Sequence, residues 1–109
     1  MINARTIADI LSLYKKHDWN LRRVLLSDGL RVNITDALQD LFGGAEIVSS
    51  NLNAIWFSRP SKNGAEAWEL RRLNDAPFAL VKVFESDIEA EDREEILRET
   101  EMRMQNINV

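Results

Sequence analysis

Apolar residues near the start of the chain follow the spacing of an amphipathic helix. They fall at i, i+3, i+4 and i+7, which places them on one helical face: Ile7, Ile10, Leu11 and Tyr14. Asn3 and Thr6 are both suitable N-terminal caps. The pattern predicts a helix that runs to about His17.

The next segment has a strand pattern followed by a turn signal. Residues 19–26 end in three apolar residues, and Asp28-Gly29 is typical of a type I′ turn because both residues tolerate positive φ. We therefore predict a hairpin over about 19–33, in which Leu25 pairs with Val32.

A short helix and a four-stranded meander are predicted in the middle of the chain. Thr35 can cap a helix from Asp36 to Phe42, and Gly43-Gly44 would end it. The strands are expected at residues 46–49, 54–59, 65–73 and 78–84. The turns between them are rich in asparagine, proline and glycine, and they cover residues 51–53, 60–64 and 74–77.

Turn lengths set the expected pairing of these strands. A four-residue final turn places Glu69 opposite Lys82. A five-residue turn before it places Trp56 opposite Trp68, in one apolar cluster. We prefer this turn to a two-residue one, which would run Pro60 into a paired strand.

The end of the chain is predicted to be an acidic helix. Ser86 and Glu89 can form a capping box that starts a helix to about Gln105. Residues 87–109 contain eight acids and three arginines and carry a net charge of −5, whereas the other residues carry +1. The thin apolar seam of this helix could dock on the sheet, pair with another helix, or leave the segment partly detached.

These elements predict an α+β fold in a single domain, residues 1–109. We expect an antiparallel sheet, formed by the hairpin at about 19–33 and the meander at about 46–84. An N-terminal helix, a short middle helix and a C-terminal helix would pack on one face of it.

The composition of the chain excludes several kinds of functional site. The chain has no cysteine, which excludes disulfides, thiolate nucleophiles and cysteine-bound metals. No apolar run approaches about 18 residues, so we expect a cytoplasmic protein with no membrane partner. The single histidine, His17, follows two lysines at a predicted helix end, and the phosphate-binding glycine motifs are absent. We therefore expect no enzyme and no cofactor.

The hexapeptide Trp-x-Leu-Arg-Arg-(Val/Leu) occurs twice, at residues 19–24 and 68–73. In a half-buried strand its tryptophan and leucine are core anchors, and its arginines lie at the surface or the rim. The alternative is that the arginines form an anion- or phosphate-binding site, to which Arg59 and Lys62 can also contribute. Its candidate residues are Arg22, Arg23, Arg71 and Arg72. The net charge of −4 disfavours nucleic acid as the partner.

Sheet aromatics give the second candidate surface. Trp56 and Phe57 are adjacent, so in a strand they point to opposite faces and cannot enter one core layer. At least one of them is therefore covered by a helix of the chain or by a partner chain, or is exposed, and a small-molecule groove is a further alternative. The candidate interaction surface is Trp56, Phe57, Arg59, Phe78, Leu80 and Phe84.

The sequence thus favours a small non-enzymatic protein-interaction or adaptor domain that uses sheet aromatics and arginines to bind a protein partner or, as a homodimer, a second copy of itself. Two alternatives stay open. One is an anion- or nucleic-acid-binding module that uses the paired arginines. The other is a small-molecule-binding regulatory domain with a pocket beside Trp56 and Trp68.

Overall fold

The computed structural model of the chain, which describes residues 2–74 and 76–107, is a five-stranded sheet between two layers of helices. In chain order the elements are α1 (Ala4–Lys16), β1 (Asn20–Leu26), α2 (Asp28–Asn33), the 3-10 turn η1 (Thr35–Ala37), α3 (Leu38–Phe42), β2 (Glu46–Ser49), β3 (Ala54–Pro60), the 3-10 turn η2 (Lys62–Gly64), β4 (Glu66–Arg72), β5 (Ala79–Phe84) and α4 (Ala90–Asn106). The predicted α+β class is confirmed.

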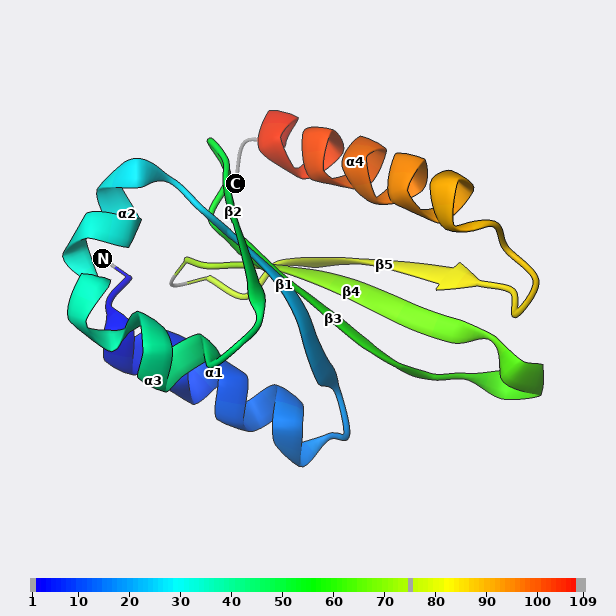
Figure 1. The fold of residues 1–109 in the computed structure, drawn as a ribbon, viewed down its shortest axis with the longest axis horizontal. Helices are drawn as coiled ribbons and strands as arrows, with labels where there is room; N and C mark the ends of the chain where they lie inside the picture. Colours follow the sequence, from blue (N-terminus) through cyan, green and yellow to red (C-terminus); the bar gives the residue numbers. More distant parts are fainter. Residues whose placement is uncertain (1, 75, 108–109) are drawn as a thin grey trace.

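The strand order is β2-β1-β3-β4-β5, and every neighbouring pair is antiparallel except β1 with β2. Figure 1 shows α1, α2 and α3 on one side of the sheet and α4 on the other. The expectation that all helices pack on one face is therefore wrong. Both faces carry apolar side chains, and each face needs its own cover.

Helix α1 matches its prediction closely. The Asn3 side chain accepts a hydrogen bond of 2.9 Å from the backbone N–H of Thr6, which satisfies one of the free donors of the first turn. The apolar stripe faces the sheet, with Ile7, Ile10 and Tyr14 buried.

The predicted hairpin at 19–33 does not form. Asp28-Gly29 instead opens α2, whose N-terminal cap is Ser27, and the Ser27 hydroxyl accepts from the N–H of Leu30 at 3.3 Å. Strand β1 pairs with β2 and β3 instead. The run Val24 to Leu26 is buried at every position, as expected of a central strand covered on both faces.

The middle helix begins later than predicted. The Thr35 hydroxyl does not cap it but donates to the carbonyl of Arg31 in α2. Residues 35–37 form the 3-10 turn, and α3 starts at Leu38. It ends at Gly43, whose positive φ of 55° is easily reached only by glycine.

The four strands of the predicted meander lie where the sequence predicts them, but β2 does not pair with β3, because β1 lies between them and β2 runs parallel to β1. The meander prediction is therefore wrong for β2, and the pairing of β3 with β4 is also shifted. Trp56 lies opposite Leu70, and Trp68 lies opposite Ser58, because the turn before β4 is moved by one residue and Pro60 enters the pairing. This shift keeps the two tryptophans on one face, with ring centroids 6.1 Å apart.

The pairing of β4 with β5 differs from the predicted one by a single residue. Trp68, not Glu69, lies opposite Lys82. A shift of one residue in only one strand moves every β5 side chain to the other face. Phe78, Leu80 and Phe84 therefore lie on the tryptophan face and not on the face of Glu69. Part of the turn responsible, Asp75, lies outside the described residues.

Helix α4 begins at Ala90, after the predicted capping box. Its N-terminal cap is Glu89, which makes no side-chain capping bond, so the Ser86 prediction is wrong. The helix packs on the sheet through Leu97, Thr100 and Met104, all buried. Buried Thr100 satisfies its hydroxyl by donating to the carbonyl of Ile96 at 2.7 Å.

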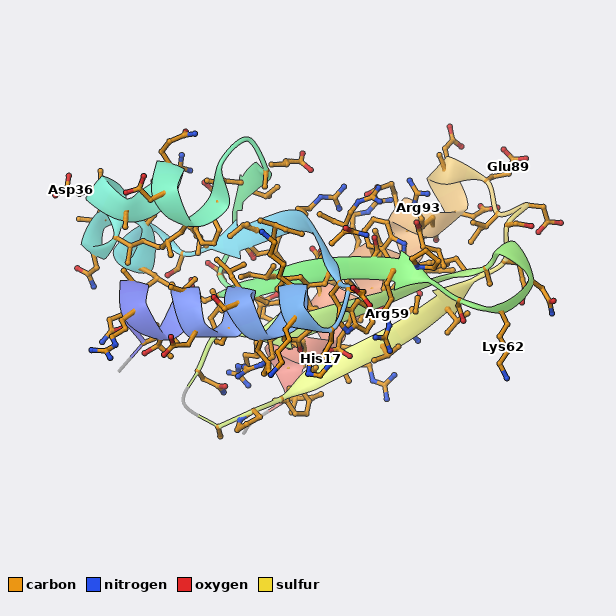
Figure 2. All side chains as sticks on the ribbon, turned by 90° about the horizontal axis from the view of Figure 1, so that it is seen from below. His17, Asp36, Arg59, Lys62, Glu89 and Arg93 are labelled. Carbon is orange, nitrogen blue, oxygen red and sulfur yellow. The ribbon has the colours of Figure 1, made fainter. Side chains whose placement is uncertain are left out.

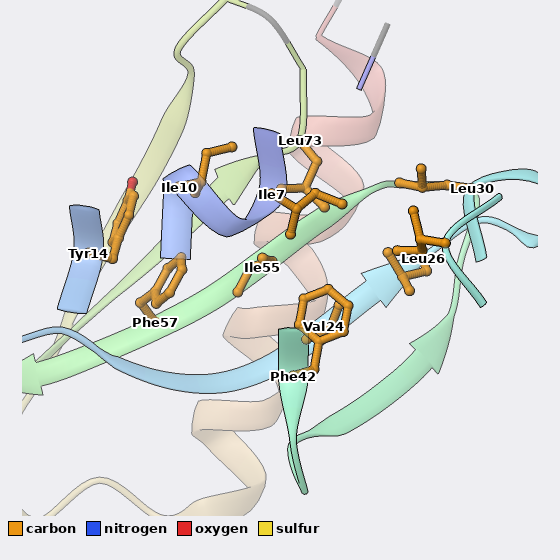
Figure 3. Close-up of a cluster of buried hydrophobic side chains, with 11 residues drawn as sticks. Ile7, Ile10, Tyr14, Val24, Leu26, Leu30, Phe42, Ile55, Phe57 and Leu73 are labelled. Atoms are coloured by element: carbon orange, nitrogen blue, oxygen red, sulfur yellow. The ribbon is translucent and has the colours of Figure 1, made fainter. Parts of the chain in front are cut away.

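Two apolar clusters fill the two faces. The α1-side cluster, part of which is drawn in Figure 3, joins α1, α2 and α3 to the sheet through residues such as Ile7, Phe42 and Phe57. The α4-side cluster joins α4 to Trp56, Trp68, Leu70 and Phe84, among others. The chain thus divides its core between two layers that share one sheet.

We expect Leu97→Ala to destabilise the protein by about 2–5 kcal/mol, because it removes a fully buried side chain from the α4-side cluster. The control is Met102→Ala on the same helix, where the side chain is 62% exposed and the change should stay within about 0.5 kcal/mol. Urea unfolding followed by tryptophan fluorescence measures both. Equal effects of the two substitutions would show that α4 is not part of the folded core.

Candidate functional site

One part of the sheet surface has no helix over it. On the α1 side, β1 and β3 are covered by helices, whereas Figure 2 shows β5 with no helix in front of it. We call this surface the open face. It consists of Ala67, Glu69 and Arg71 of β4 and Ala79, Val81 and Val83 of β5.

Val81 and Val83 make the open face apolar at its outer border. They are 51% and 58% exposed, among the few large apolar side chains left in solvent. They are neighbours on one face of β5. This is an edge strand, because it is the last strand of the sheet and no described residue pairs with its outer side. Apolar side chains beside an unpaired strand edge are typical of a surface that takes a partner.

A pocket of about 300 Å³ borders the open face at the end of α1. It is lined by Leu13, Tyr14, His17, Trp19, Arg59 and Glu69. These residues come from α1, the turn after it, β3 and β4. The volume lies at the lower limit of ordinary small-molecule sites, which span roughly 300–1,000 Å³.

Tyr14 and Glu69 form the inner wall of this pocket. The Tyr14 ring is stacked on Phe57, with centroids 4.0 Å apart, and its hydroxyl donates to the Glu69 carboxylate. Burial raises the pKa of Tyr14 well above its usual value, and the hydrogen bond to Glu69 and the charge of Glu69 raise it further. Tyr14 therefore stays protonated as a donor. Among the described residues, no cation lies within ion-pair distance of Glu69.

Arg59 forms the opposite wall. Its guanidinium carbon lies 4.4 Å from the ring centroid of Trp19, and one of its nitrogens donates to the carbonyl of His17 at 3.0 Å. Figure 2 shows His17 and Arg59 close together at the end of α1. The pocket thus combines a carboxylate, a guanidinium and two aromatic rings, which can bind a small molecule with charges of both signs.

The aromatic part of the predicted interaction surface is mostly internal. Trp56, Phe57 and Phe84 are buried, while Phe78 and Leu80 are partly buried against the α4-side cluster. The chain's own helices cover both faces of β3. Arg59 is exposed, at the pocket. The pocket predicted beside Trp56 and Trp68 is filled by these side chains and α4.

The four arginines of the repeated hexapeptide do not gather at one point. Arg71 lies on the open face, whereas Arg72 contacts the end of α4, where it donates to the carbonyl of Ile107 at 3.3 Å. Arg22 and Arg23 both lie on the α4 side because β1 has an irregularity between Leu21 and Arg23. Lys62 is exposed in the turn before β4.

Arg22 and Arg23 already have acidic partners. Arg23 pairs with Glu46 at 2.7 Å and with Glu94 of α4 at 3.1 Å. The hydrogen bond to Glu94 raises the pKa of Arg23, and the same bond lowers the pKa of Glu94. Arg22 lies over the Trp68 ring and 3.9 Å from Glu66. These carboxylates compete with any added anion for the same donors.

No local pattern in the sequence indicates the open face. A one-residue error in the β4–β5 pairing placed Val81 and Val83 on the tryptophan face, where they would be buried. The Tyr14–Glu69 contact joins residues that are far apart in the chain, so no local pattern indicates it. An acid in a predicted strand between Trp68 and Leu70 does indicate a second, more polar face.

Comparison of the chain with protein-family models, with curated proteins and with solved structures found no match. Within residues 2–74 and 76–107, no three His, Asp or Glu side chains are grouped so that they could hold a metal ion. None of the described helices is long and apolar enough to cross a membrane.

We expect the stability of the protein to fall above about pH 10 in a way that depends on Tyr14. Because folding raises the pKa of Tyr14, its stabilising contribution is complete below its unfolded pKa of about 10 and is lost as the pH rises toward the folded value. Tyr14 is the only tyrosine, so near-ultraviolet absorbance reports its ionisation alone. Tyr14→Phe keeps the ring and is the control for urea unfolding at each pH. Tyrosinate absorbance near pH 10 in the folded protein would contradict this prediction.

Proposed function

We propose that the protein is a small non-enzymatic protein-interaction domain that self-associates, as a homodimer, through the outer edge of β5 and the open face beside it. The observation that carries this proposal is the exposure of Val81 and Val83 next to an unpaired strand edge. The non-enzymatic part rests on the sequence, which has one histidine and no cysteine. A cytoplasmic location belongs to the same proposal.

The contrast between the two edges of the sheet supports it. Proteins commonly protect edge strands by making them short or by placing charges, prolines or bulges on them. The edge strand β2 has four residues, begins with Glu46 and follows this rule. The edge strand β5 has six residues, five of them apolar, and its single charge, Lys82, projects to the α4 side. Strand β5 is therefore the edge suited to pairing with another chain.

We expect the molar mass from light scattering to approach twice 12.6 kDa as the protein concentration rises. Val81→Lys should move the equilibrium toward the monomer by at least about tenfold in Kd, because burial of a lysine charge opposes the contact. The control is Val32→Lys, on the 72% exposed side chain in α2, which should leave the dimer intact. A wild-type protein that stays monomeric at every concentration would refute self-association.

A second candidate function is binding of a small molecule in the pocket at the end of α1. The supporting observation is that Glu69 and Arg59 line one pocket together with Tyr14 and Trp19. Such a pocket suits a small zwitterion, whose ammonium group would bind Glu69 and whose carboxylate would bind Arg59. Free amino acids are the simplest molecules of this class.

We expect titration with glycine, leucine or lysine to change tryptophan fluorescence, because Trp19 lines the pocket while Trp56 and Trp68 are buried elsewhere. Trp19→Phe should remove the change, and Glu69→Gln should weaken binding about tenfold or more by removing the charge that holds the ammonium group. Isothermal calorimetry provides the same constants without a fluorophore. No response to any of the three amino acids at millimolar concentration would exclude this function.

A further inference from the structure

The backbone of β5 alternates between residues that bond to β4 and residues that point away from it. The N–H of Arg72 donates to the carbonyl of Phe78 at 2.9 Å, and the same pairing continues through Leu70 with Leu80 and Trp68 with Lys82. In antiparallel strands, every second residue exchanges both bonds with its partner, and the residues between have their backbone groups on the other side. Ala79, Val81 and Val83 therefore direct their N–H and C=O groups outward.

We propose that a second copy of this chain pairs its β5 antiparallel to this edge, with the two-fold axis at Val81. This proposal rests on the proposed self-association and specifies its geometry. Val81 lies opposite the partner's Val81, and Ala79 lies opposite the partner's Val83. All outward backbone groups between Ala79 and Val83 are then paired, and the two sheets become one continuous sheet.

Backbone geometry and charge exclude the neighbouring arrangements. A residue whose backbone N–H and C=O groups point outward must lie opposite another such residue of the partner. The two-fold axis therefore passes through a residue and not between two residues. An axis at Lys82 places the two ammonium groups directly opposite each other, which is destabilising. An axis at Leu80 places Val83 opposite the partner's Pro77, which has no N–H to donate. The axis at Val81 avoids both penalties.

This arrangement gives the side chains on both faces of β5 suitable partners. On the open face, Val81 and Val83 lose their exposure against apolar residues of the partner. On the α4 side, Lys82 lies opposite the partner's Leu80, so its apolar stem can cover that leucine while its ammonium group stays in water. A symmetric contact of this kind closes after two copies and leaves no further edge to add a third at β5.

The absence of cysteine from the chain makes a cross-linking test direct. Val81→Cys should form a covalent dimer in oxidised glutathione, because directly opposite Cα atoms lie about 5.5 Å apart, within disulfide range. Ala79→Cys or Val83→Cys alone should not, since each is displaced from its own copy by four residues, which is about 14 Å along the strand at about 3.4 Å per residue. A mixture of these two variants should cross-link to each other. Non-reducing gels measure all four samples, and Val32→Cys in α2 measures random collision.

The outcomes separate this geometry from self-association itself. If Val81→Cys chains link to Val83→Cys chains better than to each other, the axis lies at Lys82 and the proposal is overturned. Cross-linking at the random level in every edge variant, with a wild-type dimer in light scattering, would place the contact elsewhere. A monomeric wild type would overturn both proposals. If Val81→Cys fails to fold by circular dichroism, the mixture of Ala79→Cys and Val83→Cys still decides the register.

Discussion

The pairing of β1 with β3 is the contact on which the rest of the structure depends. These two strands are central, and their apolar residues face both helical layers: Val24 and Ile55 face α1, while Leu25 and Trp56 face α4. Every other element adds to one side of this pair or extends its edge. Because neither face of this pair is in contact with solvent, the chain must supply helices for both faces. Within residues 2–74 and 76–107 no further helix covers the α1 side of β4 and β5. The open face follows from that arrangement.

The acidic character of α4 has a structural explanation. Its carboxylates bind polar groups that the sheet presents on that side: Glu94 pairs with Arg23, and Glu101 accepts a hydrogen bond of 2.8 Å from the Trp56 indole N–H. A buried indole needs such an acceptor, and a partly buried arginine needs a counter-charge. The charge difference between the body and the end of the chain is thus partly neutralised inside the fold, and the helix need not have a basic partner.

Local patterns predict most of the elements, whereas the strand pairings, the hairpin and the Thr35 and Ser86 caps are predicted wrongly. The α1 stripe, the Asn3 cap and the four later strands could be identified because their signals lie within a few residues. The helical conformation of Asp28-Gly29 could not be identified in this way. Whether these residues form a turn or a helix depends on Ser27, the N-terminal cap of α2, which also donates its N–H to the side chain of distant Asn53 at 2.7 Å. The repeated hexapeptide is the clearest case. An irregularity in β1 places Arg22 and Arg23 on one face, whereas regular β4 separates Arg71 from Arg72, so one sequence gives two arrangements.

The division of the core into two layers has a consequence for synthesis of the chain. The α1-side cluster is built from residues between Ile7 and Leu73, whereas the α4-side cluster lacks Leu97 and Met104 until the last helix is made. At about 5–20 residues per second, translation of this last part takes on the order of seconds. Until α4 packs, Trp56, Trp68 and Leu70 have no helix to cover them. The nascent chain therefore passes through a stage at which its most aromatic surface is available to chaperones and to neighbouring chains.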